Sequence, residues 1–218
     1  MRLTHDPRLR EEFPQLSVAT VHLDGVSDTA DVSATAASFL ERASARLAES
    51  PESDFPEVAA WRRAFSQMGL KPTQYRCASE ALLRRYRKDG SLPSIHPLVD
   101  LCNAVSVAYA IPIAVFDLDH VTGDLTVTHA RGTETFLSFG GGIETPGAGE
   151  VIFVDDAGNA HARRWSNRQS ALSAIAPSTR RVLIVSEALH PTGADDVAAL
   201  RADLSVALAA HWSSPLRG

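Results

Sequence analysis

The apolar pattern of this chain changes near Pro112, and that change does most to limit its fold. Before it, apolar side chains recur at helical spacing, as in Val58, Trp61, Phe65 and Met68. After it, turn residues separate short β-rich segments at residues 113–118, 125–130, 150–156, 160–165 and 180–188. Helices followed by strands, rather than alternating with them, predict an α+β fold in which most strands pair antiparallel.

Further elements follow from capping and periodicity. Ser79 is the expected N-cap of a helix that Gly90 ends, and Pro97 fits the first turn of the next helix. The sequence therefore predicts one early strand, over residues 14–26, and four more helices, over residues 34–48, 79–88, 97–109 and 195–212.

Charge and cysteine content narrow the class of protein. A net charge of −5 argues against a general nucleic-acid coat, although a local basic face is compatible with it. Cys77 and Cys102 are the only cysteines, and without a secretory signal we expect reduced thiols, no disulfide and no zinc site. The chain has no apolar run long enough to span a bilayer, and we expect a cytoplasmic protein. We also expect no metal or cofactor.

Basic residues gather at three places: within residues 76–88, within residues 163–168, and at Arg180 with Arg181. Basic side chains interleaved with an aromatic ring can follow a phosphate backbone and stack a base, whereas a solvated helix face and a strand edge would look the same in sequence. The residues concerned are Arg76, Arg84, Arg85, Arg163, Arg164, Trp165 and Arg168.

Glu187 follows the apolar run of residues 182–185, so it is expected at the end of a buried strand. A carboxylate there is costly unless it is functional or paired, and a rim position paired with Arg180 or Arg181 is the alternative. The eight histidines have no serine or cysteine partner at a meaningful spacing. We therefore expect solvent-exposed or capping roles for them, His161 included.

Three segments carry a family resemblance: residues 71–119, RRWSNRQS at 163–170 and VLIVSEAL at 182–189. Together they resemble the B3/B4 domain of the phenylalanyl-tRNA synthetase beta subunit, which hydrolyses wrongly charged aminoacyl-tRNA. The resemblance implies a B3/B4-like domain over residues 57–191. We expect residues 1–56 to belong to the same globule and residues 192–218 to form a C-terminal amphipathic helix.

The resemblance also implies site residues. Asn103 matches a family Asn and is the expected catalytic group, holding the ester or a water. Cys102 stands where the family has a pocket-lining Thr, and Ala114 where it has a His. Glu187 matches a Glu that recognises the tyrosine hydroxyl. We expect Cys102, Ala114 and Glu187 to bind substrate, although the first two lack the family's polar groups.

RRWSNRQS replaces a glycine-rich element of the synthetases and looks like a signature of freestanding B3/B4 proteins. The expected function is hydrolysis of a mischarged aminoacyl-tRNA in trans by a positioned water, with tRNA or aminoacyl-tRNA as partner. The resemblance implies that Arg76, Arg84, Arg85, Arg163, Arg164, Trp165 and Arg168 bind the tRNA. A non-catalytic module that binds tRNA or an amino acid is the main alternative. A third possibility is an interaction protein whose C-terminal helix docks a partner. The sequence does not determine whether the protein is an enzyme, and it does not determine the oligomeric state.

Overall fold

The computed structural model describes residues 1–212. In chain order the elements are β1 (Leu3–His5), α1 (Pro7–Glu12), β2 (Ser17–Asp24), α2 (Ser33–Glu49), η1 (Glu52–Asp54), α3 (Pro56–Gln67), α4 (Ala78–Asp89), α5 (Pro97–Tyr109), β3 (Ile113–Asp117), η2 (Leu118–His120), β4 (Leu125–His129), β5 (Phe136–Leu137), β6 (Ile143–Glu144), β7 (Val151–Asp155), β8 (Ala160–Arg163), β9 (Arg168–Gln169), β10 (Arg181–Ala188) and α6 (Gly193–His211).

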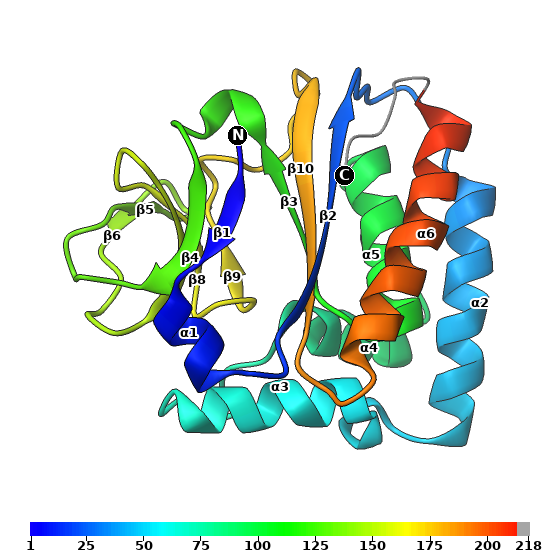
Figure 1. Ribbon diagram of the computed structural model, residues 1–218. Coiled ribbons are helices and arrows are strands. Elements are labelled where there is room, and N and C mark those ends of the chain that lie inside the picture. Colours follow the sequence, from blue (N-terminus) through cyan, green and yellow to red (C-terminus); the bar gives the residue numbers. More distant parts are fainter. Residues whose placement is uncertain (213–218) are drawn as a thin grey trace.

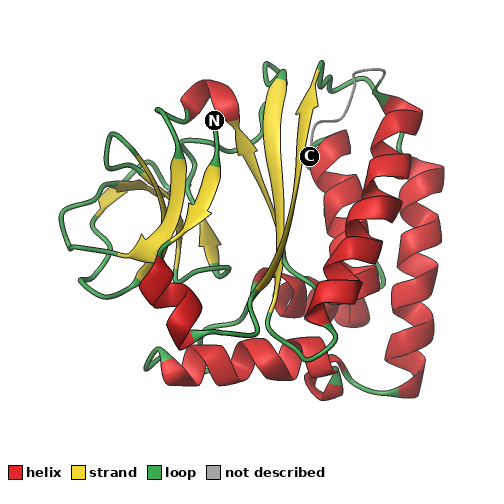
Figure 2. Ribbon diagram, in the orientation of Figure 1, coloured by secondary structure: helices red, strands yellow, loops and turns green. Residues whose placement is uncertain are grey.

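These elements form three layers (Figure 1). A three-stranded antiparallel sheet of order β2-β10-β3 stands in the middle. Helices α5 and α6 cover one of its faces, with α2 packed outside them against α5, and a five-stranded sheet of order β1-β4-β7-β8-β9 faces the other (Figure 2). Helix α3 packs along one end of the gap between the two sheets. The predicted α+β class is confirmed.

The middle strand β10 is buried on both faces, which explains its continuous apolar run. Its side chains alternate, so Val182 and Ile184 pack against the helices, while Leu183 and Val185 pack between the sheets. Glu187 shares the parity of Leu183 and Val185. The strand period therefore directs this carboxylate into the space between the two sheets.

The helical layer matches the expected pattern. The helices expected at 34–48, 97–109 and 195–212 are confirmed as α2, α5 and α6. Pro97 lies in the first turn of α5, and the His96 ring accepts a hydrogen bond from the Leu98 N–H at 3.2 Å. Leu98, Cys102 and Val105 pack into the core against the middle sheet. Rigid packing of α5 thus fixes where Asn103 lies.

Several local predictions were wrong or incomplete. Helix α4 begins at Ala78, with Cys77 as N-cap, so Ser79 is a buried first-turn residue rather than the cap. The strand expected over 160–165 ends at Arg163. Elements β1, α1, β5, β6 and β9 were not expected, because each is two to six residues long and too short to show a period. Strand β1 pairs with β4 in parallel.

Within residues 1–212, none of the helices has both the length and the apolar character needed to cross a membrane.

Candidate functional site

Two neighbouring hollows lie on either side of β3. We call the first the carboxylate hollow; it has a volume of about 70 Å³ and is lined by Ala78, Pro112, Ile113, Ala114, Phe153, Ala162, Trp165, Ser166, Asn167, Arg168, Gln169, Val185 and Glu187. We call the second the amide hollow; it has a volume of about 200 Å³ and is lined by Ile95, Val99, Cys102, Asn103, Ile113, Val115, Phe139, Gln169, Ala174 and Ile175. Ile113 and Gln169 belong to both, so the hollows share a wall.

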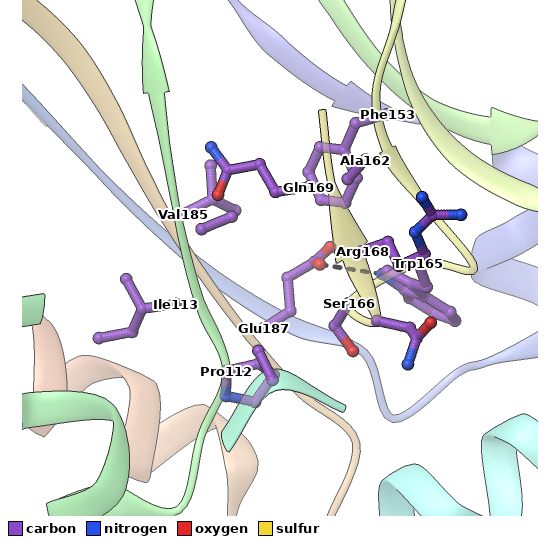
Figure 3. Close-up of a pocket in the computed structure, with 13 residues that line it drawn as sticks. Pro112, Ile113, Phe153, Ala162, Trp165, Ser166, Arg168, Gln169, Val185 and Glu187 are labelled. Atoms are coloured by element: carbon purple, nitrogen blue, oxygen red, sulfur yellow. Dashed lines mark hydrogen bonds between the residues drawn. The ribbon is translucent and has the colours of Figure 1, made fainter. Parts of the chain in front are cut away.

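Glu187 is the one acidic side chain lining the carboxylate hollow. It is 4% exposed, and its two oxygens have different partners. Oε1 lies 2.5 Å from Nε2 of His5, and Oε2 accepts a hydrogen bond from the Trp165 indole at 2.9 Å. Figure 3 shows the carboxyl group turned toward that indole. Two internal partners offset part of the cost of burying this charge.

The alternative placement of Glu187 at the rim is wrong. Arg181 pairs with Asp119 instead, and Arg180 donates to backbone carbonyls of Val26, Pro177 and Thr179. Glu187 is the last residue but one of β10, whereas Arg181 begins the strand and Arg180 precedes it. Its burial in a hollow is therefore not accounted for by a surface ion pair.

The turn between β8 and β9 holds Trp165 in an unusual conformation. Arg164 and Trp165 have φ values of 46° and 57°, the left-handed region that bulky residues seldom occupy. The Trp165 backbone N–H donates to Val151 at 2.7 Å, and its ring packs edge-on against Phe13 and Trp61. Such strain is found where the surrounding structure fixes it, often at functional sites. Here it directs the indole N–H at Glu187.

Gln169 forms the wall between the hollows with a fixed amide. Its Nε2 donates to the backbone carbonyl of Val115 at 2.6 Å. Because a carbonyl only accepts, the amide nitrogen must face Val115, so the orientation of the amide is determined. Within residues 1–212 the Gln169 side chain makes its hydrogen bond through Nε2 and none through Oε1, so an acceptor is available at the junction of the hollows.

The predicted site residues divide between the hollows. Glu187 and Ala114 line the carboxylate hollow, whereas Cys102 and Asn103 line the amide hollow. Asn103 is half-buried, and its side chain makes no hydrogen bond within residues 1–212. Burial raises the pKa of the Cys102 thiol to about 12, so a thiolate nucleophile is absent at neutral pH. Of the α5 residues that line the amide hollow, Asn103 is thus the one with an available polar group.

Two members of the predicted RNA-binding set are not available for it. Trp165 is 0% exposed, so the expected stacking face is wrong. Arg163 is buried and bidentate to Glu150, with a further bond to Glu144 at 2.5 Å, and these carboxylates raise its pKa. Arg163 thus links β8 to β6 and to the residue before β7, and Trp165 packs against Phe13 and Trp61.

The other basic residues keep partial exposure but have internal partners. Arg168 is bidentate to Glu144, Arg76 pairs with Glu80, Arg84 with Glu52, and Arg85 with Asp89. Each of these contacts uses part of the positive charge that a phosphate group would need.

Contacts bring Arg76, but not Arg84 or Arg85, beside the second basic group near the carboxylate hollow. The Arg164 guanidinium stacks over the Tyr75 ring at 4.8 Å, and Asn167 donates to the Arg76 carbonyl at 2.8 Å. Arg168 lines the hollow itself. Their use in RNA binding stays a prediction.

His161 has a role that sequence spacing did not reveal. Its Nδ1 lies 2.8 Å from the Ser173 hydroxyl, and its Nε2 lies 3.2 Å from Asp155 Oδ2. The expected exposed or capping role is therefore wrong for this histidine. Although the order serine, histidine, aspartate suggests a hydrolytic triad, Ser173 and His161 are 0% exposed and line neither hollow. The network stabilises the fold instead.

This network predicts a pH-dependent stability. Burial lowers the pKa of His161 from its ordinary value of 6.5. The unfolded chain then binds a proton more readily, so the free energy of unfolding falls as pH drops below about 6.5. Urea denaturation at pH 7, 6 and 5 should show this loss, and His161→Gln should reduce its slope. An unchanged slope would contradict the assignment. The lowered pKa of buried His96 has the same sign, so the slope should not vanish.

A larger hollow, of about 560 Å³, is less suited to chemistry. It lies on the outer face of the five-stranded sheet, where Thr126 and Thr128 point away from the core. The carboxylate of Glu134 there accepts the backbone N–H groups of residues 131–133. Burial opposes ionisation of Glu134, but these bonds outweigh it and lower its pKa. Its acidic groups are thus used to hold the loops.

Two residues of the site were beyond sequence reasoning. His5 lies in a three-residue strand, and Gln169 in a two-residue strand. Neither segment has a period, and neither residue type is unusual in its local sequence. The long-range pairing of β1 with β4 brings His5 to Glu187, and the pairing of β9 with β8 places Gln169 between the hollows.

Comparison with known proteins gives a consistent picture. The family model described as "B3/4 domain" matches residues 60–206. The chain is 33% identical over 119 residues to the phenylalanine–tRNA ligase beta subunit of Gluconobacter oxydans, covering 51% of this chain and 14% of that protein. It is 38% identical over 79 residues to the same subunit of Nitrobacter winogradskyi, covering 36% and 10% respectively. The chain thus spans a small part of these relatives.

A solved structure is similar in fold. The N-terminal fragment of the phenylalanyl-tRNA synthetase beta subunit from Pyrococcus horikoshii superimposes with a TM-score of 0.53 at 12% identity. The match covers 99% of this chain and 50% of that fragment. At that identity the likeness establishes the arrangement of elements and not the chemistry.

Proposed function

We propose, because this chain belongs to the B3/4 domain family, that it hydrolyses the ester bond of a mischarged aminoacyl-tRNA in trans. The observation that carries the proposal is the buried Glu187 carboxylate in an apolar hollow that shares a wall with the hollow of Asn103. In this proposal the carboxylate hollow binds the side chain of the amino acid, and the amide hollow supplies polar groups beside it.

The carboxylate hollow suits an amino-acid side chain that carries a hydrogen-bond donor. Its walls include Pro112, Ile113, Phe153 and Val185, and Glu187 is an acceptor among them. A ligand without a donor would leave that buried acceptor without a further partner, and such a mismatch gives strong discrimination. Glu187 therefore selects the ester by its side chain.

Hydrolysis needs a water held against the ester carbonyl. The water oxygen bonds to the carbonyl carbon, the bond from that carbon to the ribose oxygen breaks, and the ribose oxygen takes up a proton. We assign the Asn103 amide to the carbonyl or the water, and Gln169 Oε1 to a donor on the substrate, such as its α-ammonium group. Positioning of this kind supplies much of the rate without a side-chain base.

Deacylation of a panel of correctly and wrongly charged tRNAs tests the proposal. We expect turnover of at least one mischarged species, with correctly charged tRNAs spared. The basic residues near the hollow mouth, Arg76, Arg164 and Arg168, are the proposed contacts to the tRNA backbone. Their interaction should weaken as salt rises, because phosphate contacts release counterions. No turnover of any species would overturn the proposed hydrolysis.

A non-catalytic binding module is the second candidate. The observation that favours it is Ala114, which supplies no polar group to the carboxylate hollow, together with a buried Cys102 thiol. Saturable retention of tRNA or of a free amino acid, without deacylation, would support this candidate over the first.

A further inference from the structure

His5 contacts Glu187, which lines the carboxylate hollow, from outside the segment that matches the family. The family match spans residues 60–206, whereas His5 ends the first strand, β1. In that strand Leu3 and His5 share one face, and Thr4 points the other way. Leu3 packs into the core between the sheets, which places His5 there also. The His5 side chain is 3% exposed.

His5 and Trp165 together fix the plane of the Glu187 carboxyl group. A carboxylate can only accept, so Nε2 of His5 and Nε1 of Trp165 are both donors. Each oxygen of Glu187 receives one of them. Both donors come from the five-stranded sheet and its β8–β9 turn, and Glu187 comes from the middle sheet. The carboxyl group is therefore held from one side, and each oxygen keeps acceptor capacity for a ligand.

We propose that His5 is a positioning residue that sets the ligand selectivity of the carboxylate hollow. It holds Glu187 so that a spare lone pair faces an uncharged donor, such as a hydroxyl group on the ligand. This inference rests on the proposed function, since it takes the hollow to bind an amino-acid side chain. The donated proton also offsets part of the charge on Glu187, so a cationic side chain gains less than it would from a bare carboxylate.

Non-hydrolysable ligands test this role without relying on catalysis. The probes are 3′-aminoacylamido-adenosines in matched pairs, tyrosyl with phenylalanyl and threonyl with valyl, so that each pair differs by a hydroxyl group or by its replacement with a methyl. Binding is measured by calorimetry for the full chain. The quantity compared is the ratio of dissociation constants within a pair, because a general loss of structure changes both members alike.

Three variants of β1 separate positioning from packing. His5→Leu removes the donor, and His5→Gln keeps an N–H at similar reach. Thr4→Val alters the opposite face of the same strand, where Thr4 contacts the Thr126 hydroxyl at 3.2 Å. If His5→Leu does not fold, His5→Asn replaces it, because its amide is about one bond too short to reach Oε1. Circular dichroism establishes that each variant is folded.

We expect the wild type to prefer the hydroxyl member of at least one pair. His5→Leu should reduce that preference about tenfold, the size of a lost hydrogen bond to a charged group. His5→Gln and Thr4→Val should keep most of it. Equal weakening of both members in His5→Leu would overturn the positioning role and leave the proposed function standing. Binding of no probe by the wild type would overturn the hollow as a ligand site and this inference with it.

Discussion

Glu187→Ala is expected to lower the free energy of unfolding by about 3–5 kcal/mol. The substitution removes the acceptor for two buried donors, the Nε2–H of His5 and the indole N–H of Trp165. With 4% of Glu187 exposed, water does not readily replace it. The loss is measured by urea denaturation, followed by circular dichroism. Asp89→Ala is the matched control, since its ion pair with Arg85 is exposed and should change stability by less than about 1 kcal/mol.

A double replacement identifies the origin of this loss. His5→Leu combined with Glu187→Met removes the charge and its partner together and roughly conserves volume. Because two apolar groups that replace a buried pair are often tolerated, the double variant should be more stable than the sum of the single losses predicts. Strict additivity of the single changes would contradict the coupling of His5 to Glu187.

This expected cost changes how Glu187 is used as a functional probe. The alanine variant would lose activity by unfolding as well as by altered recognition, so it does not separate the two. Glu187→Gln is the better choice, because its amide oxygen still accepts from one of the two donors. A change in which ester is cleaved, at unchanged fold, then reports recognition.

Asn103→Ala is expected to slow deacylation about 100-fold, the usual effect of removing one amide that stabilises the developing charge on a carbonyl. Its side chain makes no hydrogen bond within residues 1–212, and alanine suits the interior of α5. The free energy of unfolding should therefore stay within about 1 kcal/mol of the wild-type value. The rate is measured on whichever mischarged tRNA the panel selects, at saturating enzyme.

Cys102→Ser is the companion variant from the same hollow. Because the Cys102 pKa of about 12 leaves no thiolate, the replacement should keep the rate within a few-fold of the wild type. Loss of all activity in Cys102→Ser would instead indicate a covalent route through the thiol. An unchanged rate in Asn103→Ala would remove Asn103 from the mechanism and direct attention to Gln169, whose free carbonyl faces both hollows.

Much of the fold followed from sequence because its signals are local. The stripe of Val58, Trp61 and Phe65 is buried on α3, and Gly90 ends α4 at a φ of 70°. The run of residues 182–185 is the doubly buried middle of β10. In each case the signal lies in neighbouring residues, either as a hydrophobic period or as one residue that the backbone conformation requires. The segments that were missed, such as β9, are too short to carry one.

The candidate site followed from sequence only in part. Resemblance singled out Glu187 and Asn103, and both line hollows. It could not show that they lie in separate hollows, or that Gln169 stands between them. The pattern of basic residues around Trp165 also suggested an exposed stacking group, whereas the left-handed turn buries its ring and directs its N–H at Glu187.

The sequence by itself determined the α+β class, the helical and strand cores, and the parity that turns Glu187 inward, since all of these depend on the spacing of side chains along one segment. Only the tertiary structure decided which side chains contact Glu187 there. His5 lies 182 positions away in the chain, and Trp165 lies 22 positions away. Pairing between distant strands brings these donors to the carboxylate, and no local pattern encodes which strand becomes the neighbour.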